Sequence, residues 1–439
     1  MSARRNSLLF YGGLLVSLLT GLYKTKLIAN GFGVATSGFI GQLSMVTAFG
    51  STVAFFGLWA TAARIIHNAH QEENSETISA VASLFYVVAV ATMVIVVTVI
   101  GGGQWLLDIL GLASLPGGGW SLAALICVSA LYSFATVWWR ARKQAIQFFG
   151  WTGLGCVVST LMTQVASLQG NVTLAVMALI VTFGMPVIGW LCFDILKFAR
   201  TNFSSLKFNA SSVAFVTRGG GGGTLLQLSR MGSDVAARGI VVAQLGQAAN
   251  GIVQPYYLYA TVFMPQFIAV VQTQIIQATG PAEGKKQVES GIVQMVLSLV
   301  GFAAILTVLA PTFVRLFFSN EFSSGAGVLA MGGWSEINKW TGMVLAAVLI
   351  AGGNAAYVAI GAMLLSLGKV AMVYFLSGWL GVTSLAASSA IESFFFVSMC
   401  IFLICRTGVL SRRSCIFLFI GSCEFFGASI LTGVWYAYK

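Results

Sequence analysis

Apolar runs of about 20 residues recur along almost the whole chain, separated by short polar or glycine-rich connections. A helix of that length spans the hydrocarbon core of a bilayer. The pattern therefore predicts thirteen membrane-spanning helices. Their approximate ranges are 7–29, 37–63, 78–101, 120–139, 148–168, 172–196, 212–240, 250–273, 288–311, 327–351, 355–378, 383–405 and 414–437.

The composition agrees with a membrane protein. Hydrophobic residues make up 58% of the chain, charged residues only 8%, and the mean hydropathy is +0.90. A soluble globular protein carries about 25% charged residues, so that class is excluded. The seven cysteines include no CxxC pair, which indicates neither a disulfide framework nor a metal site. We expect an all-α polytopic membrane protein without a cofactor.

The basic residues follow the positive-inside rule when the N-terminus is placed in the cytoplasm. Fifteen then lie in cytoplasmic segments and two, Arg315 and Lys439, lie outside. The net charge of +11 is thus explained by membrane orientation rather than by nucleic-acid binding. The fifteen are Arg4, Arg5, Arg64, Arg140, Arg142, Lys143, Lys197, Arg200, Lys207, Arg218, Lys285, Lys286, Arg406, Arg412 and Arg413.

A cytoplasmic linker at 201–211 divides the predicted helices into two sets of six. The first lobe is expected at 1–200 and the second at 212–405. Because six is an even number, both lobes begin on the same side and run parallel, as in transporters built from two related halves. Residues 406–439 form an additional C-terminal helix in this scheme, so the count is twelve or thirteen.

The most unusual stretch is 218–247, where an apolar helix carries Arg230, Asp234 and Arg238. The four-residue spacing places the three charges along one stripe, with Asp234 able to pair in either direction. A charge at mid-bilayer costs about 2.5–3.5 kcal/mol on insertion scales, so the stripe should face a wet cavity or another helix. The first possibility predicts a transport pathway, and the second predicts a contact that holds two helices together.

The same helix begins with five consecutive glycines, Gly219, Gly220, Gly221, Gly222 and Gly223. No Lys-Ser or Lys-Thr follows them, which argues against a Walker-type phosphate loop. Each glycine inside a helix costs roughly 0.5–1 kcal/mol relative to alanine. We therefore predict that the helix bends or unwinds here and that the run acts as a hinge.

Further charged residues fall inside predicted helices, and basic ones are in excess. This surplus favours an anionic cargo. Lys24 and Lys26 fit equally well with side chains that snorkel to the interface, and Glu336 and Lys339, three residues apart, fit a structural or gating pair. The six cations are Lys24, Lys26, Arg230, Arg238, Lys339 and Lys369, and the four acids are Asp234, Glu336, Glu392 and Glu424.

Amide and aromatic side chains offer possible sugar contacts. Gln266 follows the tyrosines at 256, 257 and 259 on the eighth predicted helix, and Gln42 lies on the second. Amides hydrogen-bond to hydroxyl groups, and aromatic faces suit the apolar faces of sugar rings. An interfacial tyrosine belt and a proline kink explain the same residues equally well.

Three stretches carry a resemblance to a known family. They are GLYKTKLIANGFGVATSGFIGQLSMVTAFGS, PTFVRLFFSNEFSSGAGVLAMGGWSEINKW and LIAGGNAAYVAIGAMLLSLGK. They resemble Wzx-type flippases of lipid-linked oligosaccharides, in particular the branch that moves enterobacterial common antigen or the O-antigen units of lipopolysaccharide. That family belongs to the MOP superfamily, which also contains the MATE exporters and MurJ.

The resemblance implies a non-enzymatic transporter of the bacterial inner membrane with two six-helix lobes. Its cargo would be an undecaprenyl-pyrophosphate-linked oligosaccharide, turned from the cytoplasmic to the periplasmic leaflet by alternating access. The family pattern supports Lys26 and the pair Glu336 and Lys339 as site residues. The implied partners are membrane lipid, H⁺ or Na⁺ as a coupling ion, and a polysaccharide polymerase with its chain-length regulator. The family usually has twelve helices, which leaves the membrane crossing of 414–437 open.

The working hypothesis is therefore a flippase in which basic residues hold the pyrophosphate. Lys24, Lys26, Arg230, Arg238, Lys339, Lys369, Gln42 and Gln266 are the candidate substrate contacts, and Asp234, Glu336 and Glu392 are the candidate coupling or gating residues. A MATE-like exporter of small cations is the main alternative, although it predicts a cavity rich in acids. A membrane-bound glycan polymerase or ligase is disfavoured by the short external loops.

Overall fold

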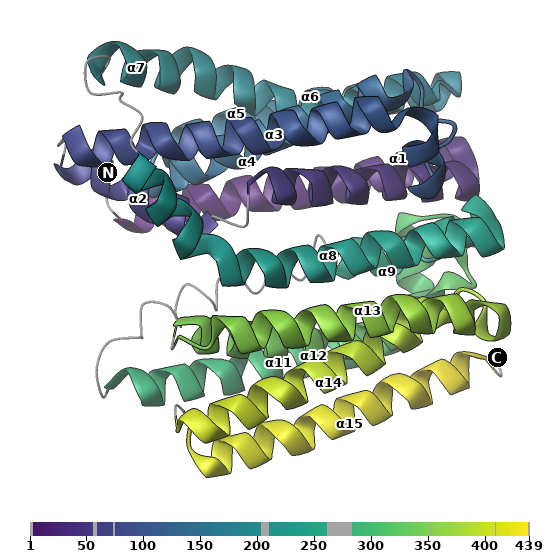
Figure 1. Ribbon diagram of the computed structural model, residues 1–439. Coiled ribbons are helices and arrows are strands. Elements are labelled where there is room, and N and C mark those ends of the chain that lie inside the picture. The colour runs from purple at the N-terminus through teal and green to yellow at the C-terminus, as the bar shows by residue number, and fades with distance from the viewer. Residues whose placement is uncertain are drawn as a thin grey trace. The chain divides into compact units, whose positions relative to one another are not determined.

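The computed structural model describes residues 3–55, 59–72, 75–202, 210–260, 283–351, 353–408 and 410–437, and its regular secondary structure over these ranges is helical (Figure 1). Nine helices within the described residues are long and apolar enough to cross a membrane. The predicted class, an all-α polytopic membrane protein, is confirmed. The candidate ligand Gln266 and most of the predicted helix at 250–273 lie outside the described residues.

The chain forms two compact units. Unit 1 contains residues 1–32 and 42–228, and unit 2 contains residues 33–41 and 229–439. The division therefore falls inside the helix that carries the glycine run, whereas most of the predicted linker at 201–211 lies outside the described residues. The additional C-terminal segment belongs to unit 2.

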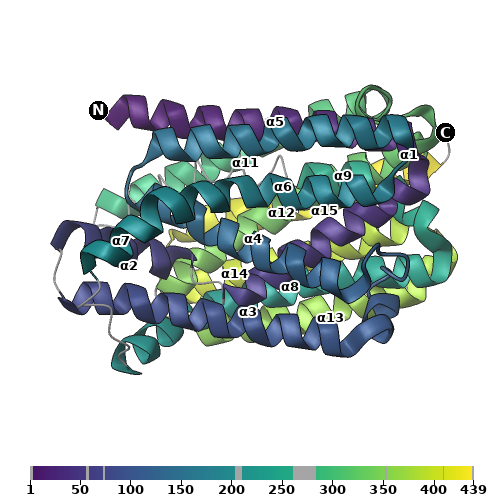
Figure 2. The ribbon, with the colours of Figure 1, turned by 90° about the horizontal axis from the view of Figure 1, so that it is seen from above.

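Unit 1 is organised around aromatic side chains. Phe85 stacks on Phe134 with ring centroids 4.2 Å apart and on Trp190 at 5.8 Å, while Trp138 meets Trp190 edge to face. Its long helices α3 to α6 run alongside one another in both views (Figures 1 and 2). Its elements are α1 (Ala3–Ala54) apart from residues 33–41, α2 (Trp59–Glu72), α3 (Ser75–Ile109), α4 (Gly118–Ala141), α5 (Ala145–Gln169), α6 (Val172–Trp190), a π-helical turn (Leu191–Ile195), α7 (Leu196–Asn202) and the start of α8 (Ala210–Ile252).

Unit 2 is built around α12 (Gly325–Ala351), which packs against α11, α14 and α15. Helices α13, α14 and α15 follow one another through short turns (Figure 1). The other elements are the second part of α8, α9 (Gln254–Leu258), α11 (Glu283–Phe317), a 3₁₀ turn (Asn320–Phe322), α13 (Ala355–Leu380), α14 (Thr383–Thr407) and α15 (Arg412–Ala437). Helix α15 matches the predicted segment 414–437 and is one of the nine candidate spans.

Two glycines interrupt the longest helices. Gly33 in α1 has φ 75° and ψ −174°, and Gly246 in α8 has φ 85° and ψ 172°. This conformation is essentially restricted to glycine. Gly33 separates the two helices predicted at 7–29 and 37–63, the second of which ends earlier, at Ala54, with α2 beginning at Trp59.

The glycine run at 219–223 is helical, which corrects the prediction that the helix bends or unwinds there. Neighbouring turns supply every backbone partner that a helix needs, so the modest cost of glycine is tolerated. The interruption of α8 lies instead at Gly246, where the backbone enters a region that other residues avoid.

Candidate functional site

Six charged residues of unit 2 form one connected set, which we call the charge network. Cations and acids alternate along it in the order Arg230, Glu392, Lys369, Asp234, Lys339 and Glu336. Four helices contribute: α8 carries Arg230 and Asp234, α14 carries Glu392, α13 carries Lys369, and α12 carries Glu336 and Lys339.

Lys369 lies at the centre of the charge network. Its Nζ contacts Asp234 Oδ1 directly and lies 3.4 Å from Glu392 Oε2. The Lys369 side chain is 2% exposed and that of Glu392 is 4% exposed. Groups buried this deeply are stable as ions only when each charge has close partners. Lys369 is a close partner for two carboxylates on two different helices.

The two ends of the charge network differ. Arg230 Nε lies 3.5 Å from Glu392 Oε1, and its guanidinium lies over the Phe396 ring at 4.3 Å from the centroid. At the other end, Glu336 accepts hydrogen bonds from Tyr256 Oη at 3.0 Å and from Trp340 Nε1 at 2.9 Å. Glu336 is fully buried and held by donors on both oxygens.

The most accessible part of the charge network is the contact between Asp234 and Lys339. The two groups lie 3.8 Å apart, and their side chains are 14% and 20% exposed. Lys339 also lies 3.2 Å from Glu336, so the predicted three-residue pair is present. Asp234 and Lys339 are therefore the members of the charge network with the largest exposed fractions.

The spacing of Arg230, Asp234 and Arg238 allows Asp234 to pair along its own helix, but its partners lie elsewhere. Asp234 pairs with Lys369 and Lys339 on other helices rather than with an arginine one turn away. A pair along one helix contributes only about 0.2–0.5 kcal/mol in isolated helices, whereas a pair across packed helices offsets part of the cost of burying two charges. Arg230 and Asp234 thus join α8 to α12, α13 and α14.

Arg238 occupies a separate cage within unit 2. Its Nε donates to Asn250 Oδ1 at 2.6 Å and its Nη2 to Gln254 Oε1 at 2.9 Å. The guanidinium lies over the Tyr257 ring at 4.3 Å from the centroid, and the side chain is 1% exposed. Uncharged amides and an aromatic face therefore orient this arginine.

The cage also fixes a close crossing of two backbone segments. Asn250 Nδ2 donates to the Gly38 carbonyl at 2.8 Å. A Cβ at Gly38 would lie 2.4 Å from the Gln247 carbonyl, and one at Gly251 would lie 2.0 Å from the Val34 carbonyl. Because only glycine allows this approach, residues 33–41 belong to unit 2 although the rest of α1 does not.

The remaining predicted basic residues lie in unit 1. Lys24 Nζ donates to Ser159 Oγ at 3.2 Å and to Thr182 Oγ1 at 3.1 Å. Lys26 is half-buried. Within the described part of the chain, no carboxylate lies within 4.0 Å of Lys24 or Lys26. Hydroxyl groups rather than acids hold Lys24, which argues against a side chain that simply extends to the interface.

The predicted amide and acid contacts have mixed outcomes. Gln42 is fully buried and its Nε2 donates to the Leu110 carbonyl at 2.9 Å, so in this structure it anchors the end of α3 within unit 1. Glu424 is exposed on α15 and is not one of the three acids of the charge network. The tyrosines at 256, 257 and 259 are buried, which excludes the interfacial belt as their explanation.

Sequence reasoning missed Asn250 and Trp340, which complete the cage and the network. An amide in an apolar helix beside the glycine at 251 was the available signal for Asn250. Nothing in the sequence distinguishes Trp340 from other tryptophans in apolar helices, so its hydrogen bond to Glu336 was not predictable.

Comparison with known proteins identifies the architecture. No family model matches the sequence, and no curated protein matches it. Among solved structures, an inward-facing multidrug resistance MATE transporter of the MOP superfamily superposes with a TM-score of 0.68 at 15% identity, over 90% of this chain and 94% of that one. The chain has a MATE-like fold.

Two other solved structures share this MATE-like fold. The lipid II flippase MurJ, in an inward closed conformation, matches with a TM-score of 0.61 at 12% identity and covers 98% of this chain and 97% of its own. A MOP superfamily transporter from Pyrococcus furiosus, described by the reversed polarity of its binding pocket, matches with a TM-score of 0.59 at 12% identity, over 97% and 95%. The shared feature is the fold.

Proposed function

We propose that this protein is a flippase that moves an undecaprenyl-pyrophosphate-linked oligosaccharide, an O-antigen unit or a related surface glycan, from the cytoplasmic to the periplasmic leaflet. One observation carries the proposal. The three acids of the charge network each have a basic partner within 4.0 Å, whereas two hydroxyl groups hold Lys24, which has no carboxylate within that distance among the described residues. The intramembrane charge available to a cargo is therefore positive and suits a pyrophosphate.

Lys24, Lys26 and Arg238 are the basic residues that we assign to the pyrophosphate. Arg238 offers a planar guanidinium suited to two phosphate oxygens, and its cage fixes that plane. Lys24 is oriented by two hydroxyls that can give way to a stronger acceptor. The polyprenyl tail would remain in lipid while the glycan crosses with the headgroup.

The membrane potential supplies a driving force in the right direction. Moving one elementary charge across 100 mV changes the free energy by about 2.3 kcal/mol, so two negative charges leaving an inside-negative cell gain about 5 kcal/mol. We assign ion coupling to the charge network, where Asp234 and Lys339 are its accessible members. H⁺ would act by protonating Asp234 and releasing Lys369, and Na⁺ would act by replacing a lysine beside the same carboxylate.

A MATE-like exporter of small cations is the second candidate, and the structural likeness to a multidrug transporter favours it. A cationic substrate needs a carboxylate that is free to bind it. Asp234, Glu336 and Glu392 already have basic partners, which weakens this candidate.

The test is transport by the purified full-length protein in liposomes. A fluorescent undecaprenyl-pyrophosphate-linked glycan is loaded in one leaflet, and a cationic dye serves as the competing substrate. We expect glycan translocation that accelerates with an imposed potential, and no dye export. In Lys24→Gln and Arg238→Gln, translocation should fall at least about tenfold, since each loses one charged hydrogen-bond donor.

The matched control is Arg200→Gln, which removes one exposed positive charge from α7. It should translocate the glycan at the wild-type rate. Dye export without glycan translocation would replace the proposal with the exporter, and wild-type translocation by both test variants at equal protein levels would remove Lys24 and Arg238 from the site.

A further inference from the structure

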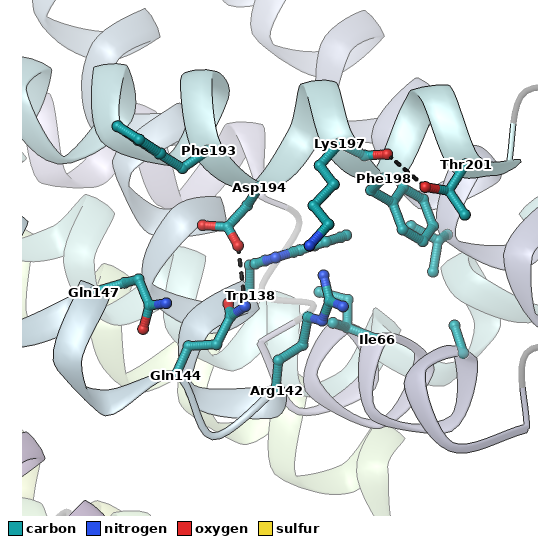
Figure 3. A pocket seen from close by; sticks show the side chains of 12 residues that line it. Ile66, Trp138, Arg142, Gln144, Gln147, Phe193, Asp194, Lys197, Phe198 and Thr201 are labelled. Atoms are coloured by element: carbon teal, nitrogen blue, oxygen red, sulfur yellow. Dashed lines mark hydrogen bonds between the residues drawn. The ribbon is translucent and has the colours of Figure 1, made fainter.

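A cavity of about 450 Å³ opens in unit 1, apart from every residue assigned to transport above (Figure 3). It lies between the C-terminal end of α4, the start of α5, the π-helical turn and α7, with α2 and α3 closing one side. Its lining residues are Ile66, Ala69, Val81, Trp138, Arg142, Gln144, Gln147, Phe193, Asp194, Lys197, Phe198 and Thr201. The positive-inside rule places this end in the cytoplasm.

The π-helical turn Leu191–Ile195 shapes one wall of the cavity. A π turn inserts one extra residue into a helix and so changes which side chains face inward. Here Asp194 points inward with 7% exposure, while its neighbour Phe193 is 62% exposed. Lys197 follows on α7 and lines the same cavity.

The single acid of the lining is already satisfied. Asp194 Oδ2 accepts from Trp139 Nε1 at 2.8 Å, and Oδ1 accepts from Gln144 Nε2 at 3.0 Å. These hydrogen bonds join α4, the start of α5 and the π-helical turn. Arg142 and Lys197 together outnumber this one acid, so the lining carries a net charge of one positive unit.

Three donors converge on the open space. Figure 3 shows the Lys197 ammonium and the Arg142 guanidinium directed toward one another across the cavity. Two cations that share a space repel unless an anion lies between them. Trp138 is 1% exposed, and its Nε1 has no hydrogen-bond partner among the described residues. Because Trp138 lines the cavity, an acceptor bound there would satisfy this N–H.

Two further features narrow the class of ligand. Gln144 Oε1 is buried with no donor among the described residues, so a hydroxyl group on the ligand would satisfy it. Beside the cavity, Phe193 and Leu196 expose apolar side chains, at 62% and 51%. An acyl chain would lie against this surface while the headgroup occupies the cavity, as in other basic pockets that bind anionic headgroups.

We propose that this cavity binds the glycerophosphate headgroup of an anionic phospholipid. The phosphate lies between Arg142 and Lys197 and accepts from Trp138 Nε1, and a glycerol hydroxyl donates to Gln144. The bound lipid joins α4, α5 and α7 at one end of unit 1. The proposal does not depend on the transported substrate.

The experiment measures binding to the purified full-length protein in a zwitterionic detergent, by native mass spectrometry and by thermal unfolding. The probes are dihexanoyl phosphatidylglycerol, dihexanoyl phosphatidylcholine and glycerol 3-phosphate. We expect phosphatidylglycerol to bind and to raise the midpoint of unfolding, because a ligand that binds only the folded state stabilises it. Phosphatidylcholine should not do so.

Arg142→Gln and Lys197→Gln should each weaken phosphatidylglycerol binding about tenfold, the loss expected for one charged hydrogen bond. Lys197 is exposed, so its variant should fold normally. Two exposed neighbours outside the lining provide matched controls, Lys143→Gln beside Arg142 and Arg200→Gln one turn from Lys197. Both should retain wild-type affinity.

Three outcomes overturn the proposal. Equal weakening in the test and control variants means diffuse attraction to a basic surface. Binding of glycerol 3-phosphate but not of the lipid, with the same sensitivity to Arg142 and Lys197, assigns the cavity to a soluble phosphate ester. Absence of phosphatidylglycerol binding to the wild-type protein removes the site.

Discussion

At the residue scale, the buried charges of unit 2 are stabilised because basic and acidic side chains alternate along the charge network. Lys369 serves Asp234 and Glu392 together, and each acid in turn has a second basic partner. The sequence indicated which residues were charged and which helices carried them. It did not indicate their pairing, because partners such as Lys369 and Asp234 are 135 positions apart and approach only when the helices pack.

Removal of Lys369 should therefore destabilise unit 2 strongly. Lys369→Met leaves two buried carboxylates with one partner each, and breaking a buried ion pair costs about 3–5 kcal/mol. Arg230 and Lys339 remain and reduce that loss. Thermal unfolding in detergent should show a clear fall for this variant and a smaller one for Lys339→Met, whose side chain is 20% exposed.

The double variant Lys369→Met with Asp234→Asn distinguishes the contribution of charge neutralisation to stability from that of side-chain packing. It should recover part of the lost stability, since the uncompensated acid has become neutral. An additive loss in the double variant would mean that Lys369 contributes packing rather than charge neutralisation.

At the element scale, two glycine breaks shape the longest helices. Gly33 and Gly246 adopt a conformation that other residues avoid, and the crossing of Gly38 with Gly251 brings residues 33–41 into unit 2. The presence of a glycine in the sequence does not show whether its φ and ψ angles are helical. The run at 219–223 remains helical, whereas Gly246, an isolated glycine in the same helix, breaks it.

Gly246→Ala and Gly223→Ala should consequently have opposite effects. The first forces a Cβ into a strained backbone conformation and should cost about 1–3 kcal/mol. The second adds a Cβ to a helical position with no atom within 4 Å, and should stabilise the helix by about 0.5–1 kcal/mol. The midpoint of thermal unfolding measures both.

The same Gly223→Ala variant tests the hinge hypothesis. A hinge needs the freedom that alanine removes, so the stabilised protein should transport more slowly. Unchanged transport with higher stability would show that the glycine run at 219–223 does not act as a hinge during transport.

At the scale of the whole molecule, the chain shares its architecture with a MATE transporter and with MurJ at 15% and 12% identity. Hydropathy and helix breaks specify such a fold, and many different side chains satisfy both requirements. The charged residues within the helices then distinguish one transporter from another. Fold alone therefore does not determine the cargo.

The C-terminal helix gives a prediction about topology. Because Arg406, Arg412 and Arg413 flank the turn between α14 and α15, the positive-inside rule places that turn in the cytoplasm and Lys439 outside. A reporter that is active only outside the cell should be inactive when fused after Gly408 and active after Lys439. Equal activity at both fusion points would mean that α15 does not cross.

The sequence by itself determined the helical class, the approximate limits of the spans and the set of charged residues within them. A bilayer demands about 20 apolar residues per crossing and backbone hydrogen bonds satisfied within each helix, and both requirements are local. Only the tertiary structure decided that the acids of the charge network are neutralised, that Arg238 is held by amides, and that Arg142 and Lys197 meet across a cavity. Those contacts join distant parts of the chain, and their energies depend on burial and distance, which exist only once the helices have packed.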